Sequence, residues 1–222
     1  MAAEVEALAA EQDLGAAVSI TAWFLRPTPH KPLRGAPRIT ARAGRASVFD
    51  NALTPEGEDT PCALARVTVI RPRPIDAPPF ETHVVDTAFD PAAHPLRPIP
   101  RGFGDPWFMD VTEVRYGGDG RFWFKPLMEI ASGGGPLSRV VGPADWSHGL
   151  VRPLPNTFID PNVTLTVELY RPPRGDWIGL EPQARWDRDQ GTGAGRAVLK
   201  DVHGDLGSVS MAVALLRMPS PE

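Results

Sequence analysis

Two segments of this 222-residue chain carry the same pattern of residues. Residues 18–27 read VSITAWFLRP, and residues 163–172 read VTLTVELYRP. Arg26 and Arg171 of these segments lie 145 positions apart, and two further pairs, Gly44 with Gly195 and Arg71 with Arg217, lie 151 and 146 positions apart. A nearly constant offset over so long a stretch indicates one structural unit that is used twice. Two copies at this spacing favour a duplicated domain over a solenoid, which has shorter periods and more copies.

The composition is that of an ordinary globular protein, and it argues against two classes of function. Hydrophobic residues make up 42% of the chain and charged residues 23%, which is enough to bury a core. The formal net charge of −4 argues against a general electrostatic affinity for nucleic acid. No run of about 18 apolar residues occurs, so no membrane span is expected.

The cysteine content and the first residues give an expectation for the cellular location. The single cysteine, Cys62, has no second cysteine to pair with, which fits a reducing compartment. The first ten residues, MAAEVEALAA, contain Glu4 and Glu6 and no basic residue, so they do not resemble a secretory signal. We therefore expect a cytoplasmic protein.

Periodicity and turn residues predict many strands and two helices. Residues 163–170 alternate apolar and more polar side chains, which is typical of a strand with one apolar face. Strands are expected at residues 18–25, 38–49, 63–71, 109–116, 121–129, 163–170, 177–188, 195–201 and 207–218. One helix is expected at residues 2–11, and a second begins near Pro136 and contains Pro143.

The order of these elements divides the chain into two copies of one unit. The second unit, residues 108–218, reads as two strands, a helix and three or more strands, which predicts a curved antiparallel sheet around a helix. Residues 1–71 form the first unit, and residues 72–107 are a proline-rich linker. Applying the offset to Met109 places the start of the first unit about 36 residues before Met1. We therefore expect the first copy to lack its opening strand pair and to begin partway through its helix.

Several motifs of the second unit resemble those of the double-hotdog acyl-CoA thioesterases, the TesB-like group. The matching segments are GPLS at 135–138, ADWSHGL at 144–150, NVTLTVELYRPP at 162–173, GDWIGL at 175–180, and a final strand after His203, Gly204 and Asp205. The resemblance covers nearly all of residues 1–218. It implies an α+β double hotdog, in which each repeat is a curved antiparallel sheet wrapped around a helix and the first repeat is truncated at its N-terminus.

The resemblance also implies a catalytic group in the second repeat. In this family an Asp on the helix, a Thr or similar residue on the next strand and a Gln on the last strand hold a water against the thioester carbonyl. Asp145 matches the Asp, and Asn162 stands at the Thr position. Thr164 lies two residues further and is expected on the same side of the strand. Ala212 stands where the Gln is expected, and alanine cannot hydrogen-bond a water.

The start of the second predicted helix offers groups that could bind a substrate. Its backbone N–H groups and positive dipole end suit a developing oxyanion, and Gly134 and Gly135 would let a carbonyl approach closely. Trp146 is a candidate for lining an acyl pocket, although packing in the core or in an interface is the simpler interpretation. Asp145 could instead be a surface or capping carboxylate, and His148 a capping or solvated residue.

Neither a metal nor a cofactor is expected, because no two histidines have the spacing of metal ligands. A group of basic residues could meet the phosphates of coenzyme A, and a solvated strand face explains them as well: Arg185, Arg188, Arg196 and Lys200.

The leading hypothesis is a hydrolase that acts on acyl-CoA or another acyl thioester. A catalytically impaired relative that binds acyl groups or acts as a scaffold stays open, because Ala212 replaces the expected Gln. A hotdog dehydratase or hydratase is a third hypothesis, for which Asp145 and His148 would have to act as a dyad. A fused double unit already pairs two hotdog sheets, so both a monomer and a homo-oligomer built through the sheets stay open.

Overall fold

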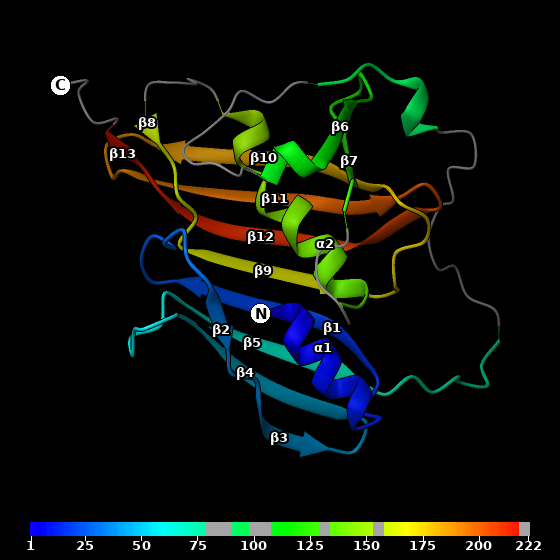
Figure 1. Ribbon diagram of the computed structural model, residues 1–222. Coiled ribbons are helices and arrows are strands. Elements are labelled where there is room, and N and C mark those ends of the chain that lie inside the picture. The colour runs from blue at the N-terminus through cyan, green and yellow to red at the C-terminus, as the bar shows by residue number, and fades with distance from the viewer. Residues whose placement is uncertain (79–89, 98–107, 129–133, 153–157, 218–222) are drawn as a thin grey trace.

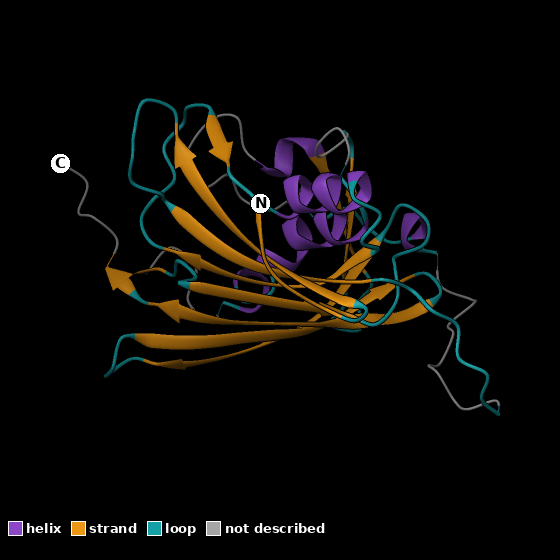
Figure 2. Ribbon diagram, turned by 90° about the horizontal axis from the view of Figure 1, so that it is seen from below, coloured by secondary structure: helices purple, strands orange, loops and turns teal. Residues whose placement is uncertain are grey.

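A large antiparallel sheet with two α-helices on one face makes up most of the protein (Figure 1). The computed structural model describes residues 1–78, 90–97, 108–128, 134–152 and 158–217. The sheet has eleven strands in the order β2-β4-β5-β1-β9-β12-β11-β10-β7-β6, and β3 pairs with β4 beside this path. Figure 2 shows both helices together on the same side of the sheet. The predicted α+β class is confirmed.

The elements follow one another in the order that the sequence predicts. In the first half of the chain they are α1 (Ala2–Glu11), β1 (Ala16–Phe24), β2 (Leu33–Gly35), β3 (Arg38–Ala43), β4 (Ala46–Pro55) and β5 (Ala63–Ile70). Next come η1 (Pro91–Ala93), η2 (Phe108–Val111), β6 (Thr112–Tyr116), β7 (Phe122–Pro126), α2 (Pro136–Asp145) and η3 (Gly149–Val151). The last elements are β8 (Phe158–Ile159), β9 (Thr164–Leu169), β10 (Ile178–Asp187), β11 (Thr192–Asp201), β12 (Gly204–Ala214) and β13 (Leu216–Arg217), of which β8 and β13 pair with each other.

The two strands that carry the sequence repeat, β1 and β9, are neighbours at the centre of the sheet. Thr21 pairs with Thr166, and their hydroxyl oxygens are 3.2 Å apart. These two threonines are also equivalent in the repeat, because they lie 145 positions apart. Antiparallel pairing of two equivalent residues is what a local two-fold axis produces, so the β1–β9 ladder has local two-fold symmetry about this pair.

One residue pair that was matched in the repeat, Gly44 with Gly195, does not occupy equivalent positions in the structure. Residues 38–49 were expected to be a single strand, but they form part of the β3–β4 hairpin, which turns at Gly44. Gly44 has a φ of 57°, a conformation that favours glycine. Its expected counterpart, Gly195, lies inside β11 and is buried. The Gly-Arg-Ala triplets that these glycines begin, 44–46 and 195–197, therefore do not correspond to each other.

The expectation that the first copy begins partway through its helix stays a prediction. Both α1 and α2 have ten residues. Only four residues separate α1 from β1, whereas eighteen separate α2 from β9. The longer connection includes η3 and β8, so the helices and the strands of the two copies are not related by one constant offset. In the described part of the chain, β7 and β6 extend the sheet beyond β10, while β3 pairs with β4 alone.

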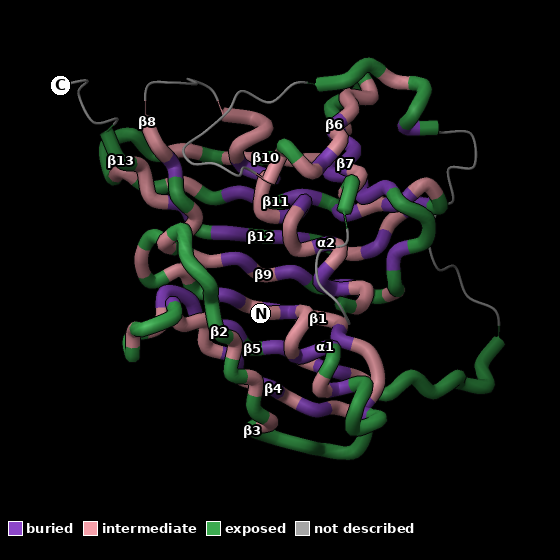
Figure 3. The backbone as a smooth tube through the Cα atoms, in the orientation of Figure 1, coloured by how far each residue is buried: buried purple, intermediate pink, exposed green. Residues whose placement is uncertain are grey.

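The core lies between the sheet and the two helices (Figure 3). Buried helix residues meet every second residue of the central strands: Val5, Ala9, Leu137, Val140 and Ala144 face Ile20, Val67, Leu165, Val167, Leu199 and Val209. Each such large aliphatic side chain contributes about 1.5–3 kcal/mol by leaving water. We call this face of the sheet the helix side. The intervening residues, such as Thr166 and Ser210, lie on the other face, which we call the open side.

Part of the predicted linker contacts the second half of the sheet. Leu96 forms a β-bridge with Arg115 of β6, and the Arg115 guanidinium donates to the His94 carbonyl over 2.7 Å. Residues 79–89 and 98–107 of the linker lie outside the described residues. Within the described residues, every helix is too short or too polar to cross a membrane.

The backbones of β12 and β9 lie close together at Gly207, which leaves no room there for a side chain. A Cβ atom at Gly207 would lie 1.9 Å from the Glu168 carbonyl oxygen. We expect Gly207→Ala to lower the free energy of unfolding by about 3 kcal/mol, because backbone atoms must move apart. Urea denaturation measures this loss. Ser208→Ala, at the exposed neighbouring position, should change stability by less than about 0.5 kcal/mol. Equal stability of the two variants would contradict this packing.

Candidate functional site

Asp145 and Asn162 meet at the C-terminal end of α2, on the helix side of the sheet. Asp145 is the last residue of α2, and Asn162 lies just before β9. The Asn162 side-chain amide donates a hydrogen bond to Asp145 Oδ1. The sequence-predicted pair is therefore in contact, although the two residues lie 17 positions apart.

Burial raises the pKa of Asp145 above its ordinary value of 3.8. The hydrogen bond from Asn162 and the proximity of His148 both lower this pKa, but burial has the larger effect. A carboxylate with a raised pKa is a stronger base than a solvated one, and Asn162 fixes the direction of its lone pairs. The pair can therefore orient a water and accept a proton from it.

Thr164 does not join this pair, contrary to the sequence-based expectation. In the β9–β12 ladder Thr166 is opposite Ser210, but Asn162 is opposite Val213, so the register shifts by one residue at the bend of Val163. Because side chains alternate along a strand, this shift places Asn162 and Thr164 on opposite faces. The Thr164 hydroxyl accepts a hydrogen bond from the Ala212 backbone N–H over 3.0 Å.

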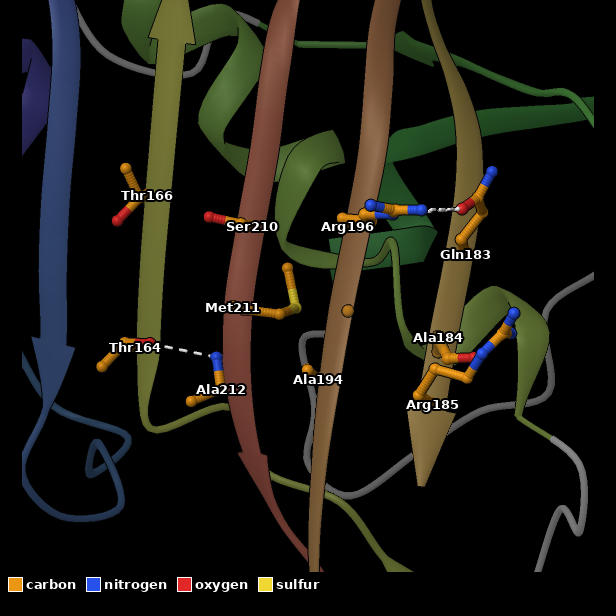
Figure 4. A pocket seen from close by; sticks show the side chains of 11 residues that line it. Thr164, Thr166, Gln183, Ala184, Arg185, Ala194, Arg196, Ser210, Met211 and Ala212 are labelled. Carbon is orange, nitrogen blue, oxygen red and sulfur yellow. Dashed lines mark hydrogen bonds between the residues drawn. The ribbon is translucent and has the colours of Figure 1, made fainter. Parts of the chain in front are cut away.

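Thr164 and Ala212 instead line a hollow of about 540 Å³ on the open side (Figure 4). Ala212, where the resemblance places a Gln, therefore lies across the sheet from Asp145. The neighbouring residues of β12 that face the helix side are Met211 and Val213, which are buried and apolar. No residue of this part of β12 offers Asp145 a second amide.

A buried polar cluster holds the segment after α2 against the segment before β9. His148 is 7% exposed, and its Nε2 lies 2.9 Å from the Asp160 carbonyl oxygen. Arg152 Nε donates to the Asp160 carboxylate over 2.9 Å, and its Nη2 donates to the other oxygen. Asp160 is two residues from Asn162, and His148 is three residues from Asp145. The cluster therefore fixes the distance between the two residues of the candidate site.

The surroundings of His148 favour the neutral ring over the protonated ring. Burial is the largest cause and lowers the pKa of His148; Arg152 also lowers it, while Asp160 and Asp145 raise it. Because a carbonyl oxygen can only accept, Nε2 carries the proton. Nδ1 lies 2.9 Å from the Met211 sulfur. Both ring nitrogens thus face protein atoms, and the His148 backbone packs against Gly195, where a Cβ atom would be 2.8 Å from the His148 Cβ.

The predicted oxyanion donors at the start of α2 are already in use. Gly135 and Ser138 donate their backbone N–H groups to Glu6 Oε2 over 2.8 and 3.1 Å, and Leu137 donates to Oε1 over 2.7 Å. Glu6 belongs to α1 and is buried. A Cβ atom at Gly135 would lie 2.7 Å from Glu6, so this glycine admits a carboxylate of the protein itself.

The start of α2, where Gly135 lies, is also far from Asp145. A helix of ten residues is about 15 Å long, and Asp145 is at its other end. The prediction that Gly135 binds the substrate carbonyl is therefore wrong. Gly134 is exposed beside it and is just as remote from Asp145. Trp146 directly follows Asp145 and packs partly buried against the core.

Sequence reasoning missed Glu6, Asp160 and Arg152. A signal for Glu6 was present, because Ala2, Val5, Glu6 and Ala9 follow helical i, i+3, i+4 and i+7 spacing and all are buried. A carboxylate within such a stripe needs a partner. No comparable pattern marks Asp160, whose partners come from an irregular segment.

The Arg152–Asp160 pair is expected to position the site. Arg152→Ala leaves a buried carboxylate without its cation and should lower stability by about 2–3 kcal/mol, reduced by the 29% exposure of Arg152. We expect turnover at the Asp145–Asn162 pair to fall as well, with partial recovery in Arg152→Lys. Arg66→Ala breaks the exposed Asp50 pair and should lower stability by less than about 1 kcal/mol. A full loss of kcat in Arg66→Ala would contradict a specific role for Arg152.

The fold is shared with several solved structures. A candidate thioesterase from Novosphingobium aromaticivorans matches with a TM-score of 0.72 at 15% identity, over 98% of this chain and 87% of that chain. An acyl-CoA thioesterase II, TesB2, from Mycobacterium marinum matches with a TM-score of 0.58 at 15% identity, over 94% and 83%. A conserved protein of unknown function with a hot dog fold from Alicyclobacillus acidocaldarius matches with a TM-score of 0.64 at 18% identity, over 96% and 83%.

No family model matches the sequence, and no curated protein matches it. The structural matches span nearly the whole chain at low identity, so they establish its architecture. The chain has the hotdog fold, as also found in structures of TesB-like acyl-CoA thioesterase II.

Proposed function

We propose that the protein hydrolyses acyl thioesters, either acyl-CoA or acyl groups on a carrier, at Asp145 and Asn162. The observation that supports this most is the Asp145 carboxylate, which burial makes more basic and which the Asn162 amide holds in place. The hotdog fold and the TesB-like motifs around Asp145 agree with it. The double-hotdog arrangement, with residues 108–218 as the repeat that carries the site, belongs to the same proposal.

In this reaction Asp145 accepts a proton from a water whose oxygen attacks the thioester carbonyl carbon. The carbon–sulfur bond then breaks, the sulfur leaves as a thiol after taking up a proton, and the acyl group leaves as a carboxylic acid. One N–H of Asn162 Nδ2 holds Asp145, so the Asn162 side-chain oxygen is left to accept a hydrogen bond from the water and the second N–H is left to donate one. Trp146, next to Asp145, is the proposed wall of the acyl site.

The second candidate is a relative that binds acyl groups without hydrolysing them. The observation that favours it is the apolar character of Met211 and Val213, which leaves Asp145 with Asn162 and no glutamine. The dehydratase hypothesis has less support, because both ring nitrogens of His148 already face Asp160 and Met211. His148 is therefore a positioning residue in this proposal and not a proton donor to a substrate.

A panel of acyl-CoA esters of increasing chain length tests the proposal by following release of the free thiol. We expect turnover with at least one ester, together with loss of most of that turnover in Asn162→Ala. Binding of acyl-CoA without thiol release would support the second candidate instead. Hydration of crotonyl-CoA, followed by loss of its enoyl absorbance, would support the dehydratase.

A further inference from the structure

The hollow on the open side has a chemical character that the proposed reaction does not use. Its floor is formed by short residues of β11 and β12, Ala194 and Ala212, which are opposite each other in the ladder. Longer polar side chains surround this floor: Thr164, Thr166, Gln183, Arg185, Arg196 and Ser210 (Figure 4). The set contains two guanidinium groups and no carboxylate.

Two other cations on the open side of the sheet have carboxylate partners. Arg66 forms an ion pair with Asp50 at 2.8 Å, and Lys200 lies 2.5 Å from Asp205. Arg185 and Arg196, by contrast, have no carboxylate within 4.0 Å among the described residues. Two positive charges on neighbouring strands therefore border one hollow, and no described carboxylate pairs with either of them.

Gln183 orients one of these guanidinium groups without reducing its charge. Its side-chain oxygen accepts from Arg196 Nε over 3.1 Å and from Nη2 over 2.8 Å. The ladder places Arg196 opposite Gln183 and Arg185 opposite Ala194, so the two arginines are diagonal neighbours. Diagonal neighbours on adjacent strands lie roughly 7–8 Å apart, close enough for both guanidinium groups to reach one ligand.

Gln183 and Arg196 begin a row of side chains that runs across the strands on the open side, and hydroxyl groups continue this row. Ser210 is opposite Arg196, and Thr166 is opposite Ser210. Figure 4 shows these side chains on successive strands along one edge of the hollow. Guanidinium forks and hydroxyl donors together are the groups that proteins use to bind phosphate oxygens.

We propose that this hollow is a second binding site, which takes a small organic molecule through a phosphate group. The phosphate binds Arg185, Arg196 and Ser210, and the organic part lies over Ala194 and Ala212. This site is separate from the Asp145 pair, because the sheet lies between them. It is also directly behind that pair: Gly195 and Met211 line the hollow and contact His148 from the helix side.

Isothermal titration calorimetry with inorganic pyrophosphate tests the site in the full-length protein. We expect saturable binding, weakened about tenfold by Arg185→Gln or Arg196→Gln alone and abolished by both together. Arg188→Gln is the matched control, since Arg188 is 95% exposed in the turn after β10 and outside the hollow. It should bind pyrophosphate as the wild type does.

Absence of saturable binding in the wild type would overturn the proposal. An equal loss in Arg188→Gln would also overturn it, because the binding would then be diffuse charge attraction. Asp145→Asn should keep full pyrophosphate affinity even when it has lost hydrolysis. A failure of the phosphate site is thus distinguishable from a failure of the proposed function.

Discussion

Replacing Asp145 with asparagine is expected to remove thioester hydrolysis while leaving the protein at least as stable as the wild type. Asparagine keeps the shape of the side chain and an oxygen that can accept the Asn162 hydrogen bond. It cannot take a proton from water, so kcat should fall on the order of 100-fold to 10,000-fold. Release of the thiol from the best ester of the panel measures this loss.

The stability of this variant follows from the raised pKa of Asp145. A group whose pKa is higher in the folded protein than in the unfolded chain favours folding when protonated, and this contribution disappears as the pH rises through the folded pKa. The unfolded value is close to 3.8. The wild type should therefore lose stability relative to Asp145→Asn as the pH rises from about 4 toward neutrality. Urea denaturation of both proteins at several pH values measures the difference.

The opposite signs of these two effects separate catalysis from structure. Glu168→Gln makes the same chemical change at an exposed position of β9 and should alter neither turnover nor stability by a measurable amount. Unchanged turnover in Asp145→Asn would remove Asp145 from the site even if the protein is a thioesterase. A large loss of stability in Asp145→Asn would mean that the carboxylate is structural.

Replacing Glu6 with alanine is expected to destabilise the contact between the two halves of the protein. Three backbone N–H groups at the start of α2 would lose their acceptor in a buried place. Each unsatisfied buried donor lowers stability by about 1–3 kcal/mol, so the total loss should be about 3 kcal/mol or more. The negative charge at a helix N-terminus adds to this effect. Thermal and urea unfolding measure it.

Two further substitutions sharpen this prediction. Glu6→Gln keeps one acceptor oxygen and loses the charge, so its stability should lie between the wild type and Glu6→Ala. Glu11→Ala, at an exposed position of the same helix, should change stability by less than about 0.5 kcal/mol. If Glu6→Ala behaves like Glu11→Ala, the carboxylate does not hold α1 to α2.

The sequence predicted the strands and helices well because its signals are local. Alternation identified β9, and the strands expected at residues 18–25, 63–71, 109–116, 121–129 and 207–218 correspond to β1, β5, β6, β7 and β12. The repeat matched residues 18–27 with residues 163–172, whose strands β1 and β9 are neighbours in the sheet, but it misaligned Gly44 with Gly195. That error arose because the connections between matched strands differ in length, which a constant offset cannot show.

The candidate site was only partly predictable, because it depends on contacts between distant segments. The motifs placed Asp145 near Asn162 correctly. The register of β9 against β12 shifts by one residue at Val163, and this shift places the Thr164 side chain on the open side of the sheet. A β-bulge of this kind leaves no signal in the amino-acid composition. The start of α2 looked free because its acceptor, Glu6, lies more than 125 residues away. Helical spacing within α1 alone would have shown that Glu6 is buried.

The central claim is that Asp145 directs a water at an acyl thioester, and a single turnover in H₂¹⁸O tests it most directly. The protein is used in excess over an acyl-CoA, and mass spectrometry follows both the released acid and the protein. The account predicts that the acid from the first turnover carries one ¹⁸O and that the protein stays unlabelled. An unlabelled acid with ¹⁸O in Asp145 would contradict it, since the carboxylate would then have attacked the thioester itself. Absence of any released acid would contradict the hydrolase altogether.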